Sequence, residues 1–529
     1  MEKTVVVVGA GLAGMMAAHA AQGEGARVIL IDRGTIGTGT NSSLSNGVFT
    51  GPTPLYSSDE YIRDTLQIGR MMNRESSVKL IAQKALASFD FLRSLGLDLV
   101  ESANFYNVRS SRPDTIAGVT MVKKLAEKVK KLDRILIVTG FYVTEILRKK
   151  DEVYGVKGFD KTGREMSIHT SAVVLATGGA GAIYLRNDNQ KGIMGQGYAL
   201  AARTGLDLWD MEFVQFYPIV IAEPHLPSML LYPPHPEEVK LVNAFGEDIL
   251  KKYGMDDLND AIMKKRDEFS AILFEETLVG KVYMDHRNVP LALWEKYPLS
   301  LLKKMKFDFQ TQPVAISPAA HFFMGGVRTN EDGMTSLQGL FACGEVVWGL
   351  HGANRRGGNA LTECVVFGNM AGYNAAQYAI TRSLSPLHLK KAPENPVFYL
   401  PSPRGKLREL RQRIRGIAWN HGGIVRSEAG LREGLHKIEE MAGQLKKTAC
   451  QIIADKIRKE DLLSAVFVLK AVLIASLARK ESRGSFYRKD FPQEDNTNWR
   501  KNSCLAYDVR KNDFTLSHHE VINPTLLCD

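Results

Sequence analysis

The stretch TVVVVGAGLAG, residues 4–14, decides the fold. Residues 4–8 are β-branched throughout, which is typical of a buried parallel strand. Gly9, Gly11 and Gly14 follow in the G-x-G-x-x-G spacing and open an alanine-rich helical segment. Glycines at these positions let the backbone approach a pyrophosphate, which then lies at the positive end of the helix. The order of strand, tight turn and helix predicts a dinucleotide-binding site.

Three other segments extend this prediction. RVILID, residues 27–32, is a second apolar strand that ends at Asp32, whose carboxylate can accept a hydrogen bond from a ribose hydroxyl. AVVLATGGAG, residues 172–181, and GLFACGEVV, residues 339–347, are apolar strands that run into glycines. Strand-to-glycine turns from such distant segments predict an α/β fold with one parallel sheet.

Length and composition favour a soluble protein of several domains. The chain has 529 residues, 44% of them hydrophobic, which allows a large core and roughly two to four domains. The first apolar run has five residues, too short for a signal peptide or a membrane span. We find no later apolar run near twenty residues, so we expect a cytoplasmic protein without a direct membrane span.

Charge and cysteine usage argue against nucleic acid and bound metal. The net charge is +10, but the basic residues are spread along helical stretches such as 122–134 and are not interleaved with aromatics. An acidic protein partner remains open. The cysteines stand far apart and lack the close pairs of iron–sulfur or structural zinc sites. They are Cys343, Cys364, Cys450, Cys504 and Cys528.

Seven stretches, in order, resemble one known family. They are VVVVGAGLAG (5–14), VVLATGGAG (173–181), WDMEFVQFYP (209–218), AAHFFMGGV (319–327), GLFACGEV (339–346), GLHGANRRGGNAL (349–361) and ESRGSFYRKDFP (481–492). The family comprises the flavoprotein subunits of fumarate reductase and succinate dehydrogenase, together with L-aspartate oxidase and soluble fumarate reductases. Because the matches span the chain, the resemblance is specific for the family.

The resemblance implies that the dinucleotide is FAD. The respiratory members carry Ser-His-Thr and tether the flavin through that histidine, whereas TNSSLSNGVF (40–49) has Asn41. Asparagine cannot form the link, so we expect non-covalent FAD with a lower reduction potential. The residues expected around it are Gly9, Gly11, Gly14, Asp32, Asn41, Ser42, Asn46, Gly47, Ala176, Thr177, Gly178, Gly179, Gly344, Glu345, Gly358, Asn359, Ala360 and Leu361.

The resemblance also assigns substrate residues. Arg355 in HGANRR is placed like the arginine that binds a substrate carboxylate over the flavin, and His321 like a second carboxylate-binding histidine. Arg266 in KKRDEFSAI is placed like the proton donor, although Lys265 stands where proline is usual. The alternative for Arg266 is a surface charge run on a helix. Arg356 matches no family role and could face a second anion, a partner or solvent.

The other end of the site departs from the family. Tyr217 stands where the dicarboxylate enzymes have a substrate-holding histidine. Residues 219–248 contain neither Thr-Glu nor Arg-Gly-Glu-Gly, which grasp the second carboxylate there. Tyr217 and Tyr232 offer hydroxyls and an aromatic wall, so we expect an uncharged or bulkier acceptor end.

The predicted fold is a Rossmann-like FAD-binding domain interrupted by an α+β capping domain and followed by a helical domain. The FAD-binding domain should comprise residues 1–218 and 328–385, and a mobile capping domain residues 219–327. A proline-rich linker, 385–405, leads into a helical domain at 400–480, where apolar residues recur at three and four. Residues 481–529 form a C-terminal tail.

These observations predict an FAD-dependent oxidoreductase acting on a C–C bond next to a carboxylate or similar group, such as an enoyl group. Without clusters of its own, it should exchange electrons with an iron–sulfur partner protein. One alternative is an L-aspartate oxidase, although that branch usually reads Ala-Ser or Gly-Ser where this chain has Gly357-Gly358. Another is an electron-relay subunit, which would have no use for Arg266, His321 and Arg355.

Overall fold

The computed structural model describes residues 3–112, 115–296, 299–382, 390–391, 405–450 and 452–521. A parallel sheet of five strands lies at its centre, in the order β17-β10-β1-β2-β6. The strands are β1 (Thr4–Val8), β2 (Arg27–Asp32), β6 (Ile135–Thr139), β10 (Ala172–Leu175) and β17 (Leu340–Ala342). The strands that the sequence predicts therefore lie side by side, with their carboxyl ends at one edge.

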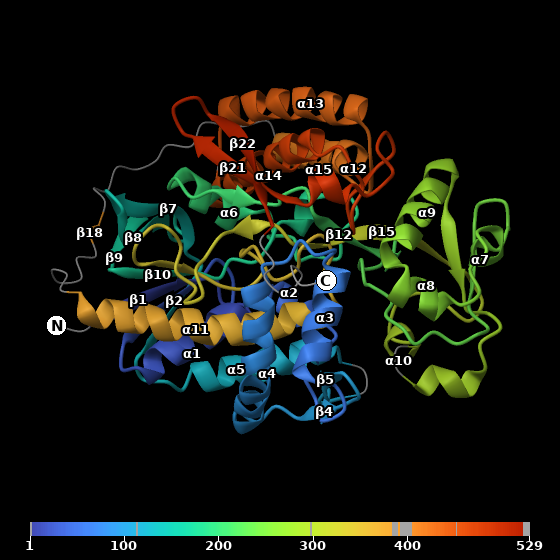
Figure 1. Cartoon of the computed structure of the whole chain (residues 1–529), viewed down its shortest axis with the longest axis horizontal. Coiled ribbons are helices and arrows are strands. Elements are labelled where there is room, and N and C mark those ends of the chain that lie inside the picture. The colour runs from blue at the N-terminus through green and yellow to red at the C-terminus, as the bar shows by residue number, and fades with distance from the viewer. Residues whose placement is uncertain are drawn as a thin grey trace.

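Helices α1 (Leu12–Gly23) and α11 (Asn359–Thr381) cross this sheet together, although they are far apart in the sequence (Figure 1). Small residues allow this close approach. A Cβ added at Gly372 of α11 would lie 2.1 Å from the Ala17 carbonyl oxygen of α1. Flanking the pair are α2 (Asn41–Leu44), α3 (Ser58–Ile68), α4 (Glu75–Ser94), α5 (Ala117–Val129) and the small sheet β3 (Val48–Thr50), β5 (Phe105–Val108), β4 (Leu99–Glu101).

Gly14 gives the first testable prediction. A Cβ at this position would lie 1.8 Å from the Gly9 carbonyl oxygen, so Gly14→Ala must displace the glycine turn. We expect a loss of about 1 to 3 kcal/mol in the free energy of unfolding and a lower flavin content. Gly23→Ala, where nothing lies within 4 Å of the added Cβ, is the matched control and should be neutral or stabilising. Urea unfolding of both variants checks this, and equal stabilities would contradict it.

A domain with its own hydrophobic core extends to the right in Figure 1. Its antiparallel sheet has the order β12 (Val214–Ile221), β15 (Val314–Phe323), β14 (Val282–Asp285), β13 (Lys240–Val242). Its helices are α7 (Ile249–Lys252), α8 (Leu258–Lys264), α9 (Arg266–Val279), η2 (Leu291–Glu295) and α10 (Leu299–Leu302). This is an α+β insertion whose long strands β12 and β15 also pass beside the FAD-binding domain.

A further sheet of the FAD-binding domain is antiparallel, with β7 (Tyr142–Lys149), β8 (Glu152–Phe159), β9 (Glu165–His169) and β18 (Lys390–Lys391). The short elements η1 (Gly181–Ile183) and α6 (Gln196–Arg203) connect β10 to β11 (Leu208–Trp209). Apart from β18, the proline-rich linker expected at 385–405 lies almost wholly outside the described residues.

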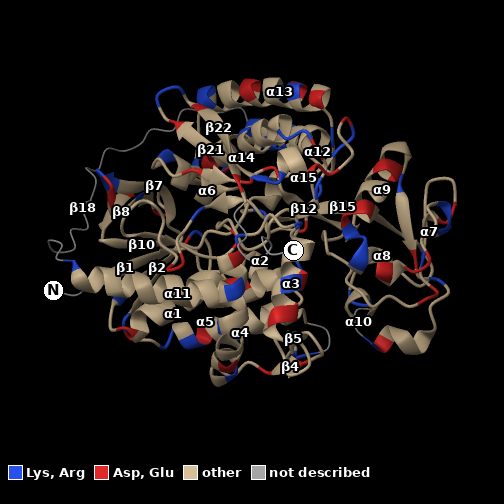
Figure 2. Cartoon of the chain, viewed as in Figure 1, with Lys and Arg blue, Asp and Glu red and all other residues tan. Residues whose placement is uncertain are grey.

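The C-terminal part is helical and then forms a hairpin. Helices α12 (Lys406–His421), α13 (Glu428–Lys447) and α14 (Ile453–Ala478) pack on one another, and basic and acidic side chains are interspersed along α13 (Figure 2). The short strands β19 (Val425–Arg426) and β20 (Tyr487–Arg488) pair with each other, and the short helix α15 (Asn496–Trp499) follows. The hairpin consists of β21 (Lys501–Asp508) and β22 (Asp513–Glu520). Strand β21 pairs with β11, which also pairs with β16 (Gly326–Val327), so the hairpin completes a sheet of the FAD-binding domain.

Helix α14 corrects one expectation from the sequence. It is long and apolar enough to cross a membrane, so the expectation of no apolar run near twenty residues was wrong. In the structure, 61% of its most apolar window is buried, against α12, α13 and α6. The apolar run thus belongs to the core of the helical domain.

Candidate functional site

A cavity of about 720 Å³ lies where the carboxyl ends of the parallel strands face the capping domain. It brings together most of the residues that the sequence predicts. Those that line it are Gly9, Gly11, Asp32, Asn41, Ser42, Asn46, Ala176, Thr177, Gly178, Gly179, Tyr217, Arg266, His321, Gly344, Glu345, Arg355, Gly358, Ala360 and Leu361.

Three predicted residues lie off the cavity wall. Gly14 packs against the Gly9 backbone, and Gly47 has a φ of +70° and packs against Ala117, so both serve the turns. Asn359 is fully buried, and its side-chain oxygen accepts a hydrogen bond from the Tyr61 hydroxyl at 3.1 Å. These residues shape the backbone next to the cavity and do not face it.

One end of the cavity suits a ribose and a pyrophosphate. The Asp32 carboxylate accepts hydrogen bonds from the backbone N–H groups of Ala10 (2.8 Å) and Gly34 (2.7 Å), which fixes it at the end of β2. Burial outweighs these bonds and raises the pKa of Asp32. The N-cap residue of α1 is Gly11, which has no capping side chain, and the N–H of Leu12 donates to the Ser42 hydroxyl at 3.2 Å. Added Cβ atoms at Gly11 and Gly178 would find no atom closer than 3.7 Å. The glycines leave room for a pyrophosphate beside the backbone, and the N-terminus of α1 is positive. The Asp32 carboxylate can accept a hydrogen bond from a ribose hydroxyl, so this end of the cavity fits an FAD.

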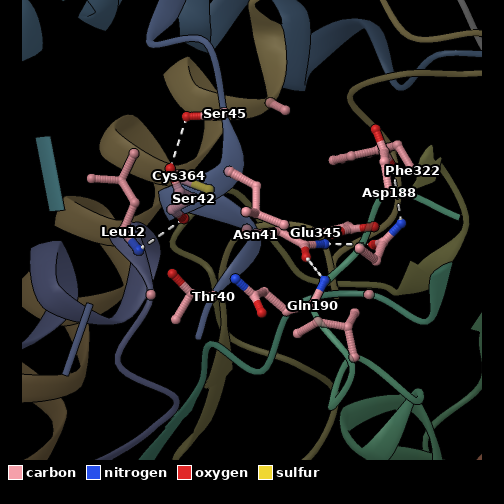
Figure 3. Close-up of a pocket in the computed structure, with 18 of the residues that line it drawn as sticks. Leu12, Thr40, Asn41, Ser42, Ser45, Asp188, Gln190, Phe322, Glu345 and Cys364 are labelled. Carbon is pink, nitrogen blue, oxygen red and sulfur yellow. Dashed lines mark hydrogen bonds between the residues drawn. The ribbon is translucent and has the colours of Figure 1, made fainter. Parts of the chain in front are cut away.

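Asn41 is held from both sides of its amide. Its nitrogen donates to the Asn189 side-chain oxygen at 2.6 Å, and its oxygen accepts from the backbone N–H of Gln190 at 3.0 Å. Figure 3 shows Asn41 between Gln190 and Glu345, with Ser42 on the side toward Leu12. The side chain therefore ties two segments of the cavity wall together.

Glu345 is a buried carboxyl beside the predicted flavin-binding glycines. Its Oε1 accepts from the backbone N–H of Phe323 at 3.1 Å and lies 2.1 Å from where a Cβ at Gly179 would stand. Burial raises its pKa to about 7.

This raised pKa predicts a pH dependence of stability. Between pH 4.5 and about 7 the folded protein keeps a proton on Glu345 that the unfolded chain releases. The free energy of unfolding therefore falls as the pH rises through this window, by about 3 kcal/mol in all. Asp210, whose pKa burial also raises to about 7, adds to the slope. Glu345→Gln should reduce the slope without abolishing it in urea titrations from pH 5 to 8, and an unchanged slope would contradict this.

Arg355 is a buried cation, 6% exposed, on the wall of the cavity. Its Nε donates to the Gln215 side-chain oxygen at 3.1 Å, and its guanidinium lies 4.8 Å from the Phe322 ring centroid. Burial, and next the charge of Arg266, lower its pKa to about 10. No carboxylate pairs with Arg355 among the described residues, so the site holds a desolvated positive charge ready for an anion.

Arg266 begins α9 and points into the same site, so it is not part of an exposed charge run. One of its terminal nitrogens donates to the Asn354 side-chain oxygen at 2.7 Å and to the Arg355 carbonyl oxygen at 2.9 Å. Its Nε is buried and finds no partner in the described part of the chain. The carboxylate of Asp267 is 3.9 Å away. These contacts hold the guanidinium rigidly beside Arg355.

His321 and Tyr217 share the wall next to these arginines, with ring centroids 5.9 Å apart. The Nδ1 atom of His321 lies 2.7 Å from a carboxylate oxygen of Asp188, which also lines the cavity. The Tyr217 hydroxyl donates to the Leu231 carbonyl oxygen at 3.2 Å. Its proton is therefore engaged within the protein.

Arg356 lies outside the cavity lining. Its guanidinium stacks on Tyr56 and Tyr61, at 4.8 and 5.5 Å from the ring centroids, and donates to the Tyr56 hydroxyl. Its carbonyl oxygen accepts from Arg355 at 3.3 Å. Arg356 thus links the loop that carries both arginines to Tyr61 of α3, and it does not line the cavity where it could meet a second anion.

The sequence alone missed several residues of this site. Gln215 and Asn354 hold the two arginines, and both lie in stretches that the resemblance had marked. Asp188 carried no local signal, because its partner His321 is 133 positions away. Apart from Tyr232, which the sequence indicated as part of an aromatic wall, the apolar part of the wall gave no signal, because its residues come from separate loops and helices. It consists of Pro227, Met229, Leu230, Leu231, Tyr232, Ile262, Met263 and Leu301.

Comparison with known proteins defines the class. Residues 4–361 match the FAD binding domain family, and residues 411–527 match the fumarate reductase flavoprotein C-terminal family. These matches, together with the glycines and Asp32 that line the cavity, show that the chain is an FAD-dependent oxidoreductase. The predicted cofactor, FAD, is confirmed.

Individual relatives narrow the class. One subunit of the fumarate reductase (CoM/CoB) of Methanothermobacter marburgensis is 30% identical over 95% of this chain and 97% of its own length. L-aspartate oxidase 1 of Ralstonia nicotianae is 29% identical over 93% and 96%. A structure of Escherichia coli quinol fumarate reductase superimposes with a TM-score of 0.85 and 25% identity, covering 99% of this chain and 97% of that one. The chain belongs to the fumarate reductase and succinate dehydrogenase flavoprotein family, as the sequence predicted.

Proposed function

We propose that the protein transfers two hydrogens across a C–C bond next to a carboxylate or similar activating group, with reduction of the double bond as the favoured direction. The observation that carries this proposal is the buried guanidinium of Arg355 on the cavity wall, which no carboxylate of the described residues pairs with. A carboxylate is the ligand that best compensates it, because a bidentate pair fixes orientation as well as charge. The desolvated site makes such a pair stronger than one at a surface.

In this proposal Arg266 delivers the proton. Addition of a hydride to one carbon of the double bond leaves negative charge beside the activating group, so the neighbouring carbon needs a positioned acid. Arg266 is fixed at the cavity wall by Asn354 and the Arg355 backbone, and its Nε–H makes no hydrogen bond within the described structure. Arg266 belongs to the capping domain, so closure of that domain brings this proton donor to the substrate and excludes water.

FAD supplies the hydride when bound, and we propose that it is held without a covalent link. Asn41 takes the place of the tethering histidine, and its amide is occupied by Asn189 and Gln190. Acid precipitation should therefore release all of the flavin into the supernatant, where its absorbance is measured. Flavin that stays with the protein pellet would contradict this.

The electrons are proposed to come from a separate iron–sulfur protein in the cytoplasm. One structural neighbour is a chain of a quinol fumarate reductase, whose name indicates that its electrons come from quinol. Reduced viologen can replace such a partner in an assay. We expect enoates to accelerate viologen oxidation by the purified protein. A rate of viologen oxidation that no enoate changes would contradict the proposal.

L-aspartate oxidase activity is the second candidate, favoured by relatives of that name. In that reaction an amine becomes an imine, with oxygen or fumarate as acceptor. Incubation of the purified protein with L-aspartate in air separates the two activities. Our proposal expects no peroxide above the background without substrate, whereas stoichiometric peroxide would establish the oxidase.

An electron-relay role without an organic substrate is the third candidate. The proximity of Arg355 and Arg266 in one cavity argues against it, because a relay needs no anion site. Loss of substrate-dependent activity in an Arg266 variant that keeps its flavin would exclude the relay.

A further inference from the structure

We infer that the cavity selects a monocarboxylate whose carbon distal to the carboxylate bears an apolar or aromatic group, and that Asp188 excludes a second carboxylate. This inference rests on the proposed function, since it names the substrate class of the same site. It follows from the apolar lining that the capping domain gives the cavity and from the charges available in the cavity.

The capping domain contributes an almost uncharged wall. The loop 227–232, α8 and α10 supply Leu230, Tyr232, Ile262, Met263 and Leu301 to the lining. Among the described lining residues of the capping domain, Arg266 and His321 are the only ones of the Arg, Lys, His, Asp or Glu types. Met263 is 57% exposed and Tyr232 is half-buried, and both line the cavity, so both present apolar surface to a ligand. A hydrocarbon group placed here would gain free energy by leaving water.

Few cations are available for a second carboxylate. Arg355 binds the first one, and Arg266 is assigned to the proton. Arg33 also lines the cavity, but it pairs with Asp461 at 2.6 Å and hydrogen-bonds the carbonyl of Gly192, next to Lys191. Arg33 and Lys191 therefore lie at the Asp32 end, where the ribose is expected.

The remaining candidate, His321, is neutralised by its neighbour. Its Nδ1 contacts the Asp188 carboxylate at 2.7 Å, a distance typical of a charge-assisted hydrogen bond. The Asp188 side chain is only 7% exposed, so its charge acts in a region of low dielectric constant. A positive His321 is balanced by Asp188, and a neutral His321 leaves Asp188 as a net negative charge. In either state a second carboxylate at this wall meets no net attraction.

The test measures binding without turnover. The oxidised flavoprotein is titrated anaerobically with 3-phenylpropanoate, butanoate and succinate, and the shift of the flavin absorbance gives each Kd. We expect 3-phenylpropanoate to bind about 10-fold more tightly than butanoate, because the ring is buried on the apolar wall. Succinate should bind about 100-fold more weakly than 3-phenylpropanoate.

Two variants test the assigned residues. Asp188→Asn keeps the shape but removes the charge, so it should tighten succinate binding about 10-fold and leave 3-phenylpropanoate within about threefold. Asp133→Asn, at an exposed position of the FAD-binding domain, is its matched control and should change neither Kd. Met263→Ala shortens the apolar wall at a partly exposed position, so it should weaken 3-phenylpropanoate about fivefold and spare butanoate.

The outcomes separate this inference from the proposed function. Succinate binding as tightly as 3-phenylpropanoate in the unmodified protein would overturn the selectivity while leaving the carboxylate site intact. An unchanged ratio of the two Kd values in Asp188→Asn would overturn the role of Asp188. Failure of all three carboxylates to bind would overturn the proposed function itself, and this inference with it.

Discussion

Replacing Arg355 by methionine should abolish carboxylate binding and at the same time stabilise the ligand-free protein. The guanidinium is buried, and no carboxylate pairs with it in the described structure, so the fold bears the cost of its desolvation. Methionine fills a similar volume without charge. We expect the free energy of unfolding to rise by about 1 to 3 kcal/mol. The affinity for a carboxylate should fall about 100-fold or more, because a charge-assisted bidentate pair is lost.

Urea unfolding and flavin-absorbance titrations measure the two effects on the same preparations. Arg356→Met is the matched control, because Arg356 stacks on Tyr56 and Tyr61 outside the cavity lining. It should destabilise the protein modestly and affect binding far less than Arg355→Met. If Arg355→Met destabilised the protein and spared carboxylate binding, Arg355 would be a structural residue.

Replacing Arg266 by alanine should remove the proton donor and lower kcat about 10²- to 10⁴-fold. The carboxylate site around Arg355 stays in place, so KM should change much less than kcat. The flavin content should also stay unchanged. Arg266→Lys keeps the charge but cannot reproduce the planar contacts with Asn354 and the Arg355 carbonyl, so it should not restore the rate.

The viologen-linked assay with an enoate gives both constants. Lys265→Ala, at the neighbouring exposed position, is the matched control and should keep full activity. An Arg266→Ala variant with an unchanged kcat would remove the proton-donor role and return Arg266 to a packing residue of α9.

The fold was predictable because its signals are local and repeated. Continuous apolar strands followed by glycines predict parallel strands whose ends meet, and β1, β2, β10 and β17 are indeed adjacent. The capping domain was predictable from the resemblance. Strand β21 was not, because nothing in residues 501–508 indicates that their partner is a two-residue strand at Leu208–Trp209. The membrane-like composition of α14 was overlooked, since charges at its N-terminal end mask the apolar run.

The site was predictable wherever a residue stands in a marked stretch, as Asp32, Glu345 and Arg355 do. It was not predictable where two distant segments create the chemistry between them. The contact of Asp188 with His321 and the contact of Arg266 with Asn354 depend on how β15, α9 and their loops meet. Long-range pairs of this kind leave no periodicity or spacing in the sequence, so only the structure reveals them.

The most direct test of the central claim is the reoxidation of the dithionite-reduced flavin, followed anaerobically by its absorbance. The acceptors are cinnamate, crotonate, fumarate and an enoyl thioester. We expect rapid reoxidation by a monocarboxylic enoate, most rapid where its distal carbon carries an apolar group, and slow reoxidation by fumarate. A flavin that stays reduced with every acceptor would contradict the claim that this protein adds hydrogens across an activated C–C double bond.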